Sequence, residues 1–393
     1  MKVLHAFNVP RSGSGSTAAS LNTIAALRAH EGVEIEVFSR SSRDLAQGLA
    51  GRLRAGVSAF YPAEAIADFR RVLAAFRPDL VHVNELFPLI SPWVLRDCHA
   101  QGVPVVMTID DYHPSCPTRN HFRAGALCTE CLGGREWRAV ANNCRDSLAE
   151  SSVNALYNAM VRRLGWLATG VAQYITPSNF TGEWAVQHAG LPAARMNTVN
   201  PTVRLPDRGV NAGDGQYIAF AGRFVPEKGV QVLLQAAGLM DLPVKLSRHV
   251  SQFVTIDLPA GVDVVVTQDR DELDTFYRGA RMLVLPSIWF DSFPTVGEEV
   301  MAHGVPVVGS RIGGISEMVQ DGVDGLLFTV GDAVQLAGLA AALWHDPSRC
   351  SRLGAAARAK ALARWGAASH AAQVMRVYER ALGRLGAPAA AAH

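Results

Sequence analysis

Two carboxylates in the second half of the chain have a spacing that could bind hydroxyl groups. Asp291 lies in a loop, and Glu299 lies eight positions later on the helix that we expect to follow. The loop leaves the apolar run 282–286, whose pattern predicts a buried strand. In an open α/β sheet, ligands bind beyond the carboxyl ends of parallel strands. Acids gathered at this edge therefore indicate a sugar or ribose ligand, and Asp291 could accept a hydrogen bond from a transferred sugar.

Two cations in a neighbouring loop could bind a diphosphate. Arg223 and Lys228 lie five positions apart, in the loop expected to join strand 217–221 to its helix. At an effective dielectric constant of about 20, one ion contact at ~4 Å is worth roughly 4 kcal/mol before desolvation. Two such cations could stabilise a departing nucleotide diphosphate without a metal ion. The alternative is a surface ion pair between Lys228 and Glu227.

Two further patterns lie near the carboxylates. Gly313 and Gly314 follow an apolar strand and precede a predicted helix, where backbone N–H groups can face an anion. Alternatively, the glycines are there only because the turn from strand to helix needs their backbone conformation, without any anion. Thr295 and Glu298 have the spacing of a capping box, which predicts that Glu298 caps its own helix. Glu299 is then the freer carboxylate for the two hydroxyls of a ribose.

The loop after the first predicted strand is rich in glycine and serine and contains Gly13, Ser14 and Gly15. It lacks Gly-x-Gly-x-x-Gly, because Ala18 occupies the third glycine position, and it lacks the Gly-Lys-Ser/Thr of a Walker A motif. We therefore expect a flexible loop over a cleft between domains, and no nicotinamide or ATP site.

Four of the six cysteines are clustered, namely Cys116, Cys128, Cys131 and Cys144. A cluster of this kind could hold a structural zinc ion. Cys128 and Cys131 form a Cys-x-x-Cys pair, but Cys116 and Cys144 have no such neighbour in the sequence. A cytosolic chain also keeps its thiols reduced. Partly buried thiols, or an occasional disulfide, are therefore the alternative to a metal site.

The composition predicts a two-domain protein that does not bind nucleic acid. A chain of 393 residues exceeds what one hydrophobic core usually serves. Its 37 basic and 35 acidic side chains are interspersed, so no basic patch is indicated. Neither a secretion signal nor an apolar run of about 18 residues is recognisable, which predicts a cytoplasmic protein. Runs 69–71 and 161–166 mix basic and apolar groups, so peripheral contact with the inner face of a membrane stays open beside ordinary surface helices.

The elements that must position these residues alternate between short β-branched runs and longer amphipathic ones. This pattern is typical of βαβ units around parallel sheets. A segment rich in turn formers, 201–215, separates two Rossmann-like halves near residue 205. We expect helix 366–386 to cross back to the first half, because its apolar side would otherwise be exposed, and tail 387–393 to be disordered. The predicted strands are 2–7, 33–38, 80–84, 104–109 and 172–176 in the first half, and 217–221, 242–246, 262–266, 282–286, 305–309 and 325–328 in the second.

Together these motifs resemble the retaining enzymes of glycosyltransferase family 4, the "glycosyl transferases group 1" type. The resemblance covers nearly the whole chain. It implies the GT-B fold, an α/β architecture of two facing Rossmann-like, doubly wound domains with a central cleft. Residues 1–205 would bind the acceptor and residues 206–365 the nucleotide-sugar donor. The motifs that carry it are Gly222-Arg223 with Lys228-Gly229, the run from Asp291-Ser292-Phe293-Pro294 to Val308, Gly313 to Glu317, Asp321 to Leu327, and in the first half 80–84 and 104–117.

The resemblance also implies roles for matching positions. Arg223 and Lys228 would bind the diphosphate, Glu299 the ribose and Asp291 the donor sugar. The family transfers a hexose-type sugar from a nucleotide such as UDP or GDP with retention, by front-face attack in which the departing phosphate assists, and it needs no metal or other cofactor. The other donor-side positions are Gly222, Ser292, Phe293, Pro294, Thr295, Gly313 and Gly314, and those on the acceptor side are Gly13, Ser14, Gly15, His82, Asn84, Asp111 and His113, with Asp110 in a catalytic position.

Three departures from the family pattern stand out. Asp291 replaces the usual first glutamate and has a shorter reach. Asp110 stands where relatives commonly have a histidine, which exchanges a potential donor for an acceptor. The strand ending at 246 continues into 247–249 without the usual Gly-x-Gly. A non-catalytic sugar-nucleotide-binding relative, or a phosphorylase or epimerase on the same fold, is therefore an alternative. A glycan, a lipid-linked sugar and a small metabolite all fit as acceptor.

Overall fold

The computed structural model describes residues 1–9, 15–41, 60–250 and 257–383. The contacts among them divide the chain into two compact units. The first unit contains Met1–His121, Thr129–Thr202 and the C-terminal segment from Ala367, and the second contains Phe122–Cys128 and Val203–Gly366. The candidate residues Gly13 and Ser14 and the predicted tail 387–393 lie outside the described residues.

The first unit is built on a six-stranded parallel sheet, as the alternating pattern predicted. The strand order is β2-β1-β3-β4-β7-β8. All five strands expected in this half are present, and the short β8 was not expected. The strands are β1 (Lys2–Val9), β2 (Glu34–Ser41), β3 (Leu80–Val83), β4 (Val105–Thr108), β7 (Gln173–Thr176) and β8 (Met196–Thr198). Its helices are α1 (Gly15–Arg28), α3 (Ala63–Phe76), α4 (Trp93–Ala100), α5 (Trp137–Ala141), α6 (Leu148–Leu164), α7 (Trp166–Thr169), α8 (Asn179–Ala189) and α15 (Ala367–Ala381).

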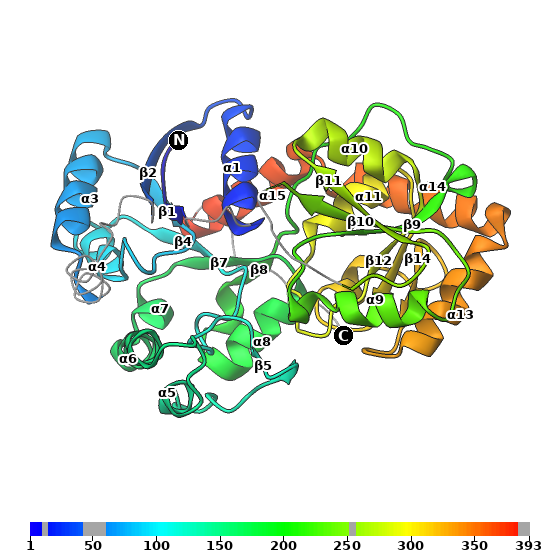
Figure 1. The fold of residues 1–393 in the computed structure, drawn as a ribbon. Coiled ribbons are helices and arrows are strands. Elements are labelled where there is room, and N and C mark those ends of the chain that lie inside the picture. Colours follow the sequence, from blue (N-terminus) through cyan, green and yellow to red (C-terminus); the bar gives the residue numbers. More distant parts are fainter. Residues whose placement is uncertain (10–14, 42–59, 251–256, 384–393) are drawn as a thin grey trace. The chain divides into compact units, whose positions relative to one another are not determined.

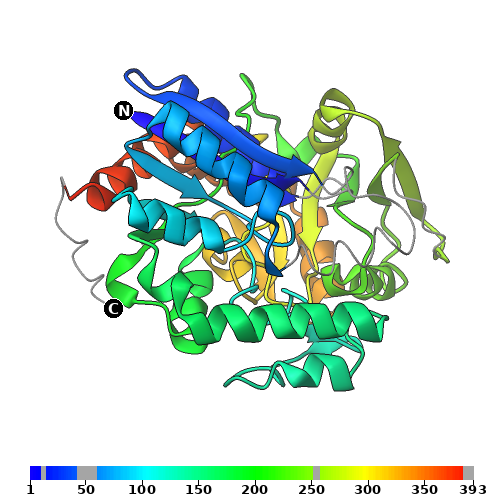
Figure 2. The ribbon, with the colours of Figure 1, turned by 90° about the vertical axis from the view of Figure 1, so that its left-hand side faces the viewer.

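Helices cover both faces of this sheet, which explains why its inner strands β3 and β4 are apolar on both sides. On one face, Leu4 and Val81 pack against α3, α4, α6 and α8. On the other face, Val3 and Leu80 pack with residues of α1 and α15. Figure 1 shows α15 beside α1, and Figure 2 shows α3 and α4 lying across the opposite face.

Buried hydrogen bonds fix α15 to this sheet. The Tyr378 hydroxyl lies 2.7 Å from Nδ1 of His82 on β3 and 3.2 Å from Nε2 of His5 on β1. Nε2 of His82 lies 2.8 Å from Oγ1 of Thr108. Burial lowers the pKa of both histidines, in His5 to about 3, so both are neutral. His82 therefore faces α15 inside the unit, and not an acceptor as we expected.

The second unit repeats the architecture. Its sheet has the order β11-β10-β9-β12-β13-β14, with all strands parallel and Leu283 paired with both Ala219 and Val307. The six expected strands are all present within a few residues, and β10 continues through 247–249. The strands are β9 (Tyr217–Ala221), β10 (Val244–His249), β11 (Val262–Thr267), β12 (Ala280–Leu285), β13 (Val307–Ser310) and β14 (Gly325–Phe328). The helices are α9 (Val230–Ala237), α10 (Arg270–Arg278), α11 (Thr295–Ala302), α12 (Ile315–Met318), α13 (Ala333–Trp344) and α14 (Pro347–Arg364), and a small hairpin, β5 (Phe122–Arg123) with β6 (Ala126–Leu127), also belongs to this unit.

In each unit the first strand lies inside the sheet, with the second strand on one side and a later strand on the other. The chain therefore leaves β9 and β12, which are neighbours, towards opposite directions of the sheet. Such a topological switch point opens a crevice at the carboxyl ends of the two strands, where ligands bind in α/β proteins. In the second unit the loops at this point carry Lys228 and Asp291, and in the first unit the loops after β3 and β4 carry Glu85 and Asp111.

The two runs that suggested membrane contact each make contacts inside the first unit, and their arginine side chains are exposed. Phe69 is fully buried, and Arg70 pairs with Asp97 at 2.8 Å. Arg162 pairs with Glu136 at 2.5 Å. Within the described ranges, no helix has both the length and the apolar character needed to cross a membrane.

Candidate active site

Lys228 and Asp291 meet at the switch point of the second sheet. Lys228 ends a short turn after β9, and Asp291 lies in the loop between β12 and α11. The Lys228 ammonium donates to Oδ2 of Asp291 at 2.6 Å, and Oγ of Ser287 donates to the same oxygen at 3.0 Å. The Asp291 side chain is 4% exposed, whereas that of Lys228 is 21% exposed. The buried carboxylate therefore holds the ammonium in place at the rim of the crevice.

Gly229 allows this meeting. A Cβ at this position would lie 1.8 Å from the carbonyl oxygen of Pro286, and its φ of +68° lies in the left-handed region. The Ile288 N–H donates to the Glu227 carbonyl at 3.0 Å, which joins the two loops. Any larger residue after Lys228 would push the loops apart.

Gly313 and Gly314 are explained by the same kind of close approach. A Cβ on Gly313 would lie 2.5 Å from the Asp291 carbonyl oxygen, and one on Gly314 would lie 2.0 Å from that of Ser292. The Gly314 N–H donates to the Asp291 carbonyl at 2.7 Å. The helix that follows, α12, has only four residues. These contacts favour the conformational explanation, and they make the two glycines the support of the loop that carries Asp291.

The donor-side candidates after Asp291 differ in placement. Phe293 is buried in the core, and the centroid of its ring lies 6.0 Å from that of Trp365 in an edge-on arrangement. It therefore anchors the loop between β12 and α11 to the core. Pro294 is the N-cap of α11, and Thr295 is the first residue of that helix. Ser292 is half-buried. Gly222 directly follows β9.

The capping box predicted for Glu298 does not form. Pro294 occupies the N-cap position of α11, and no side chain caps the helix. The Glu298 side chain is fully buried, and neither of its oxygens has a hydrogen-bond partner among the described residues. Burial, followed by the nearby charge of Glu299, raises its pKa well above the usual range. Glu298 is therefore a neutral acid in the core, because a prediction from spacing took no account of the proline at the cap.

Glu299, the next residue of α11, is held by partners that sequence reasoning missed. Its carboxylate accepts from the Arg270 guanidinium and, at 2.9 Å, from the Tyr277 hydroxyl. Nε of Arg270 also donates to Asp274 at 3.0 Å. Burial opposes the charge of Arg270, but the carboxylates of Glu299 and Asp274 outweigh it and raise its pKa. Because a carboxylate has about four acceptor positions, Glu299 can still accept from ligand hydroxyls. The only sequence signal was the arginine at the first position of a helix otherwise rich in acids.

Arg223 is the exposed member of the cation pair. Its side chain is 58% exposed, and its ion pair with Glu227 is long, at 3.9 Å. The ion pair of Lys228 is with Asp291 and not with Glu227, so the alternative of a surface pair between Lys228 and Glu227 is wrong. Each of the two predicted diphosphate-binding cations thus lies beside a carboxylate in this structure.

In the first unit, the acids after β4 form a second charged group. Burial, and then the charge of Asp111, raises the pKa of Asp110, whose side chain is hydrogen-bonded to Ser16 at the start of α1. Burial alone would raise the pKa of Asp111, but the charge and hydrogen bonds of His113 and the charge of Arg119 lower it. Oδ1 of Asp111 lies 2.7 Å from Nδ1 of His113, and its Oδ2 lies 3.6 Å from Arg119.

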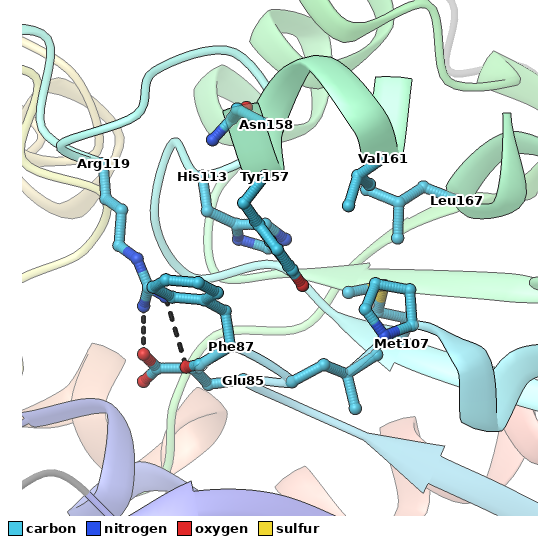
Figure 3. Close-up of a pocket in the computed structure, with 11 residues that line it drawn as sticks. Glu85, Phe87, Met107, His113, Arg119, Tyr157, Asn158, Val161 and Leu167 are labelled. Atoms are coloured by element: carbon cyan, nitrogen blue, oxygen red, sulfur yellow. Dashed lines mark hydrogen bonds and ion pairs between the residues drawn. The ribbon is translucent and has the colours of Figure 1, made fainter. Parts of the chain in front are cut away.

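Asp111 and His113 are thus brought together, and His113 lines a small pocket shown in Figure 3. Arg119, which sequence reasoning missed, crosses the mouth of that pocket and pairs with Glu85. Asn84 is buried at the end of β3, and Gly15 begins α1. Both lie near the carboxyl ends of the strands without lining this pocket.

The cysteine cluster does not assemble a metal site. In the part of the chain that the structure describes, no group of three or more His, Cys, Asp or Glu side chains could hold a metal ion. All four of the clustered cysteines lie in that part and are free thiols in this structure.

Comparison with known proteins gives matches over both units. The family model "Glycosyl transferases group 1" matches residues 205–360, and the model "Glycosyl transferase 4-like domain" matches residues 14–202. A D-inositol 3-phosphate glycosyltransferase from Arthrobacter sp. is 36% identical over 185 residues, which cover 42% of this chain and 44% of that protein. The chain spans about half the length, or less, of the first curated relatives that it matches.

Solved structures give matches over nearly the whole chain. A sucrose-phosphate synthase from Thermosynechococcus elongatus has a TM-score of 0.70 at 19% identity, over 98% of this chain and 100% of that chain. The Anabaena protein HepE, solved with UDP-glucose, has a TM-score of 0.66 at 16% identity, over 96% of this chain and 99% of that chain. Matches at these identities establish the fold alone, and the predicted GT-B fold is confirmed.

Proposed function

This chain belongs to the glycosyl transferases group 1 family, and from that premise we propose that it transfers a sugar from a nucleotide diphosphate sugar to an acceptor hydroxyl. The observation that carries the proposal is the meeting of Lys228 and Asp291, with Glu299 on the helix directly after that loop. A cation and an acid that are far apart in sequence come together where a phosphate and a sugar would bind.

In this proposal, Arg223 and Lys228 neutralise the departing diphosphate. Fixed cations stabilise charge that develops in the transition state, and they do so without reorganisation when they are already in position. Lys228 is held in this way by Asp291 and Ser287. We propose that transfer proceeds with retention and without a metal ion, with the phosphate assisting deprotonation of the acceptor.

The roles of the two acids then differ. Glu299 accepts the ribose hydroxyls while Arg270 and Tyr277 hold its carboxylate. Asp291 is engaged by Lys228 and is nearly inaccessible, so we assign it the positioning of that ammonium rather than direct contact with the sugar. We propose UDP or GDP as the donor nucleotide, and the panel of nucleotides described below distinguishes the two.

The first test is a panel of UDP, GDP and ADP and their sugars, each measured by thermal unfolding in EDTA. A ligand at 100 times its dissociation constant adds ~2.7 kcal/mol, which gives a readable shift. One base should stabilise the protein selectively. No shift with any nucleotide would refute the proposal.

The second test is Arg223→Ala, which removes the accessible cation. We expect donor turnover to fall by about 100-fold or more, as with loss of one oxyanion donor. Arg352→Ala, at an exposed position on α14, is the matched control and should turn over normally. Normal turnover in Arg223→Ala would show that Arg223 does not bind the diphosphate.

A second candidate is a relative that binds the sugar nucleotide without transferring it. It is favoured by Asp110, which stands where relatives commonly have a histidine, and by the carboxylates that already engage both cations. Selective stabilisation by a nucleotide sugar, with neither hydrolysis nor transfer over a range of acceptors, would support this candidate against the enzyme.

A further inference from the structure

A pocket lies beyond the carboxyl ends of β3 and β4 in the first unit (Figure 3). Its volume is about 20 Å³. A cavity needs roughly 10–15 Å³ of such space for one water-sized group. The pocket therefore admits a small substituent, such as a methyl group, and is too small for a whole sugar ring.

The floor of the pocket is apolar except for one hydroxyl. It is lined by Met107 from β4, Val161 from α6 and Leu167 from α7, with Phe87 and Tyr157 beside them. The last two rings pack with their centroids 4.3 Å apart. The Tyr157 hydroxyl is the one polar side-chain group among these five residues, so a water molecule here would find fewer partners than the two to four that buried water needs. The floor is therefore suited to a methyl group, and an ammonium group there would meet the cost of burying a charge without a partner.

The rim of the pocket carries a fixed hydrogen-bond donor. The Arg119 guanidinium pairs with Glu85 and donates to the Phe87 carbonyl at 3.3 Å. The backbone of Arg119 has a φ of +71°, which is uncommon for a residue with a side chain. Its N–H donates to the Cys116 carbonyl at 2.9 Å, and its carbonyl accepts from the Tyr112 N–H at 3.1 Å. These bonds hold a strained conformation that directs the guanidinium across the mouth of the pocket.

The rim also carries acceptors. Oδ1 of Asp111 accepts from the backbone N–H of His113 at 2.8 Å and lies 2.7 Å from its Nδ1. An ionised carboxylate can only accept, so Nδ1 of His113 carries the hydrogen of this contact. The Glu85 carboxylate is a second acceptor at the same mouth. Donor and acceptor groups thus surround the entrance to one apolar, methyl-sized space.

We propose that this pocket is an acceptor subsite for the acetamido group of an N-acetylated amino sugar. The methyl group fills the apolar floor, the amide carbonyl accepts from Arg119 or Asn158, and the amide N–H donates to Glu85. A phosphate is disfavoured by charge, since carboxylates outnumber the one guanidinium here. This inference rests on the proposed glycosyl transfer and names the class of its acceptor.

The experiment compares N-acetylglucosamine, glucosamine and glucose as probes, by calorimetry on the full chain saturated with the nucleotide diphosphate that stabilises it. Placing one methyl-sized group in a fitting pocket is worth about 10–200-fold. We expect N-acetylglucosamine to bind more tightly than both other sugars by at least 10-fold. Equal affinities, or no binding by any of the three, would overturn the inference.

Variants at Val161 locate the effect. Val161→Met should fill the pocket and abolish the preference for N-acetylglucosamine, with the affinity for the nucleotide unchanged. Leu156→Met changes an exposed position of the same helix and should keep the preference. If Val161→Met fails to fold, Val161→Ala serves instead, because the enlarged pocket should favour N-propionylglucosamine over N-acetylglucosamine. A preference that survives at Val161 would place acetamido binding elsewhere and refute the subsite.

The nucleotide measurement separates this inference from the function on which it rests. If nucleotides stabilise the protein and the sugars do not discriminate, the subsite is wrong and glycosyl transfer stands. If no nucleotide binds, the proposed function itself fails.

Discussion

Replacing Lys228 should destabilise the protein more than replacing Asp291, although the two side chains form one ion pair. At 2.6 Å and an effective dielectric constant of about 20, their Coulomb attraction is roughly 6 kcal/mol before desolvation. The net effect depends on what each substitution leaves behind. The Asp291 side chain is 4% exposed and that of Lys228 is 21% exposed, so only the lysine can reach water after losing its partner.

The magnitudes follow from that difference. Lys228→Met leaves a buried carboxylate with one remaining hydrogen bond, from Ser287, and should cost about 3–5 kcal/mol. Asp291→Asn keeps the shape and an acceptor oxygen, and should cost about 1–2 kcal/mol. The double variant Lys228→Met/Asp291→Asn should be more stable than Lys228→Met alone, because it removes the orphaned charge.

The sign of the pH dependence gives an independent check. An unpaired buried carboxylate has a raised pKa, so the folded Lys228→Met variant holds a proton that the unfolded chain releases above about pH 4. Its extra instability should therefore be small near pH 4 and grow as the pH rises towards 7. The Asp291→Asn variant should show no such growth.

The assay is urea unfolding of the wild type, both single variants and the double variant at pH 5 and pH 7.5. The slope of each transition is compared first, because a chain of two units need not unfold in one step. Two results would contradict this reasoning: an Asp291→Asn variant as unstable as Lys228→Met, or a double variant less stable than Lys228→Met. Either result would show that the Lys228 ammonium does not stabilise the buried Asp291 carboxylate. The positioning role given to Asp291 would then be wrong.

Three further predictions concern other buried groups. The wild-type Glu298 carboxyl must stay protonated in the folded protein, so the wild type loses stability as the pH rises from 5 to 7, and Glu298→Gln does not. The stability of Glu298→Gln relative to the wild type should therefore rise by up to ~2.7 kcal/mol over this interval, which urea midpoints at both pH values test. Arg270→Gln should weaken nucleotide binding by about 10-fold through a less constrained Glu299, and unchanged affinity in titration calorimetry would exclude that role. Because His5 and His82 are buried and neutral, the free energy of unfolding of the wild type should fall by up to ~1.4 kcal/mol per histidine for each pH unit below about 6.5. His5→Phe should fall less steeply with pH, as unfolding measured over an acid titration would show.

The fold could be predicted from the sequence because its signals are local. Apolar β-branched runs such as 217–221 and 325–328 coincide with strands, since a strand of a parallel sheet is buried on both faces and has no polar alternation to obscure it. The motif around Asp291 added the resemblance from which GT-B was predicted. The hairpin 122–127 was missed because its two strands are only two residues each.

The site was only partly predictable, because its contacts join distant segments. The residues Lys228, Asp291 and Glu299 were identified, but the ion pair spans 63 positions and depends on the order of the strands. Arg270 comes from a helix after another strand, and no local motif marks it. His82 was placed with the acceptor residues because nothing near it in sequence shows that α15 covers that face of the sheet.

The attachment of α15 also determines when the first unit can be completed during synthesis. Val374, Val377 and Tyr378 belong to the same core cluster as Val3 and Leu80, so almost the whole chain separates the two sides of one core. In chain order, Val203–Gly366 is an insertion within the first unit. A ribosome that has made the first 200 residues has made a sheet with one face covered only by α1, and its two buried histidines still lack the Tyr378 hydroxyl. The second unit has all its residues once Gly366 is made, whereas the first unit must wait for α15 before its interior is sealed.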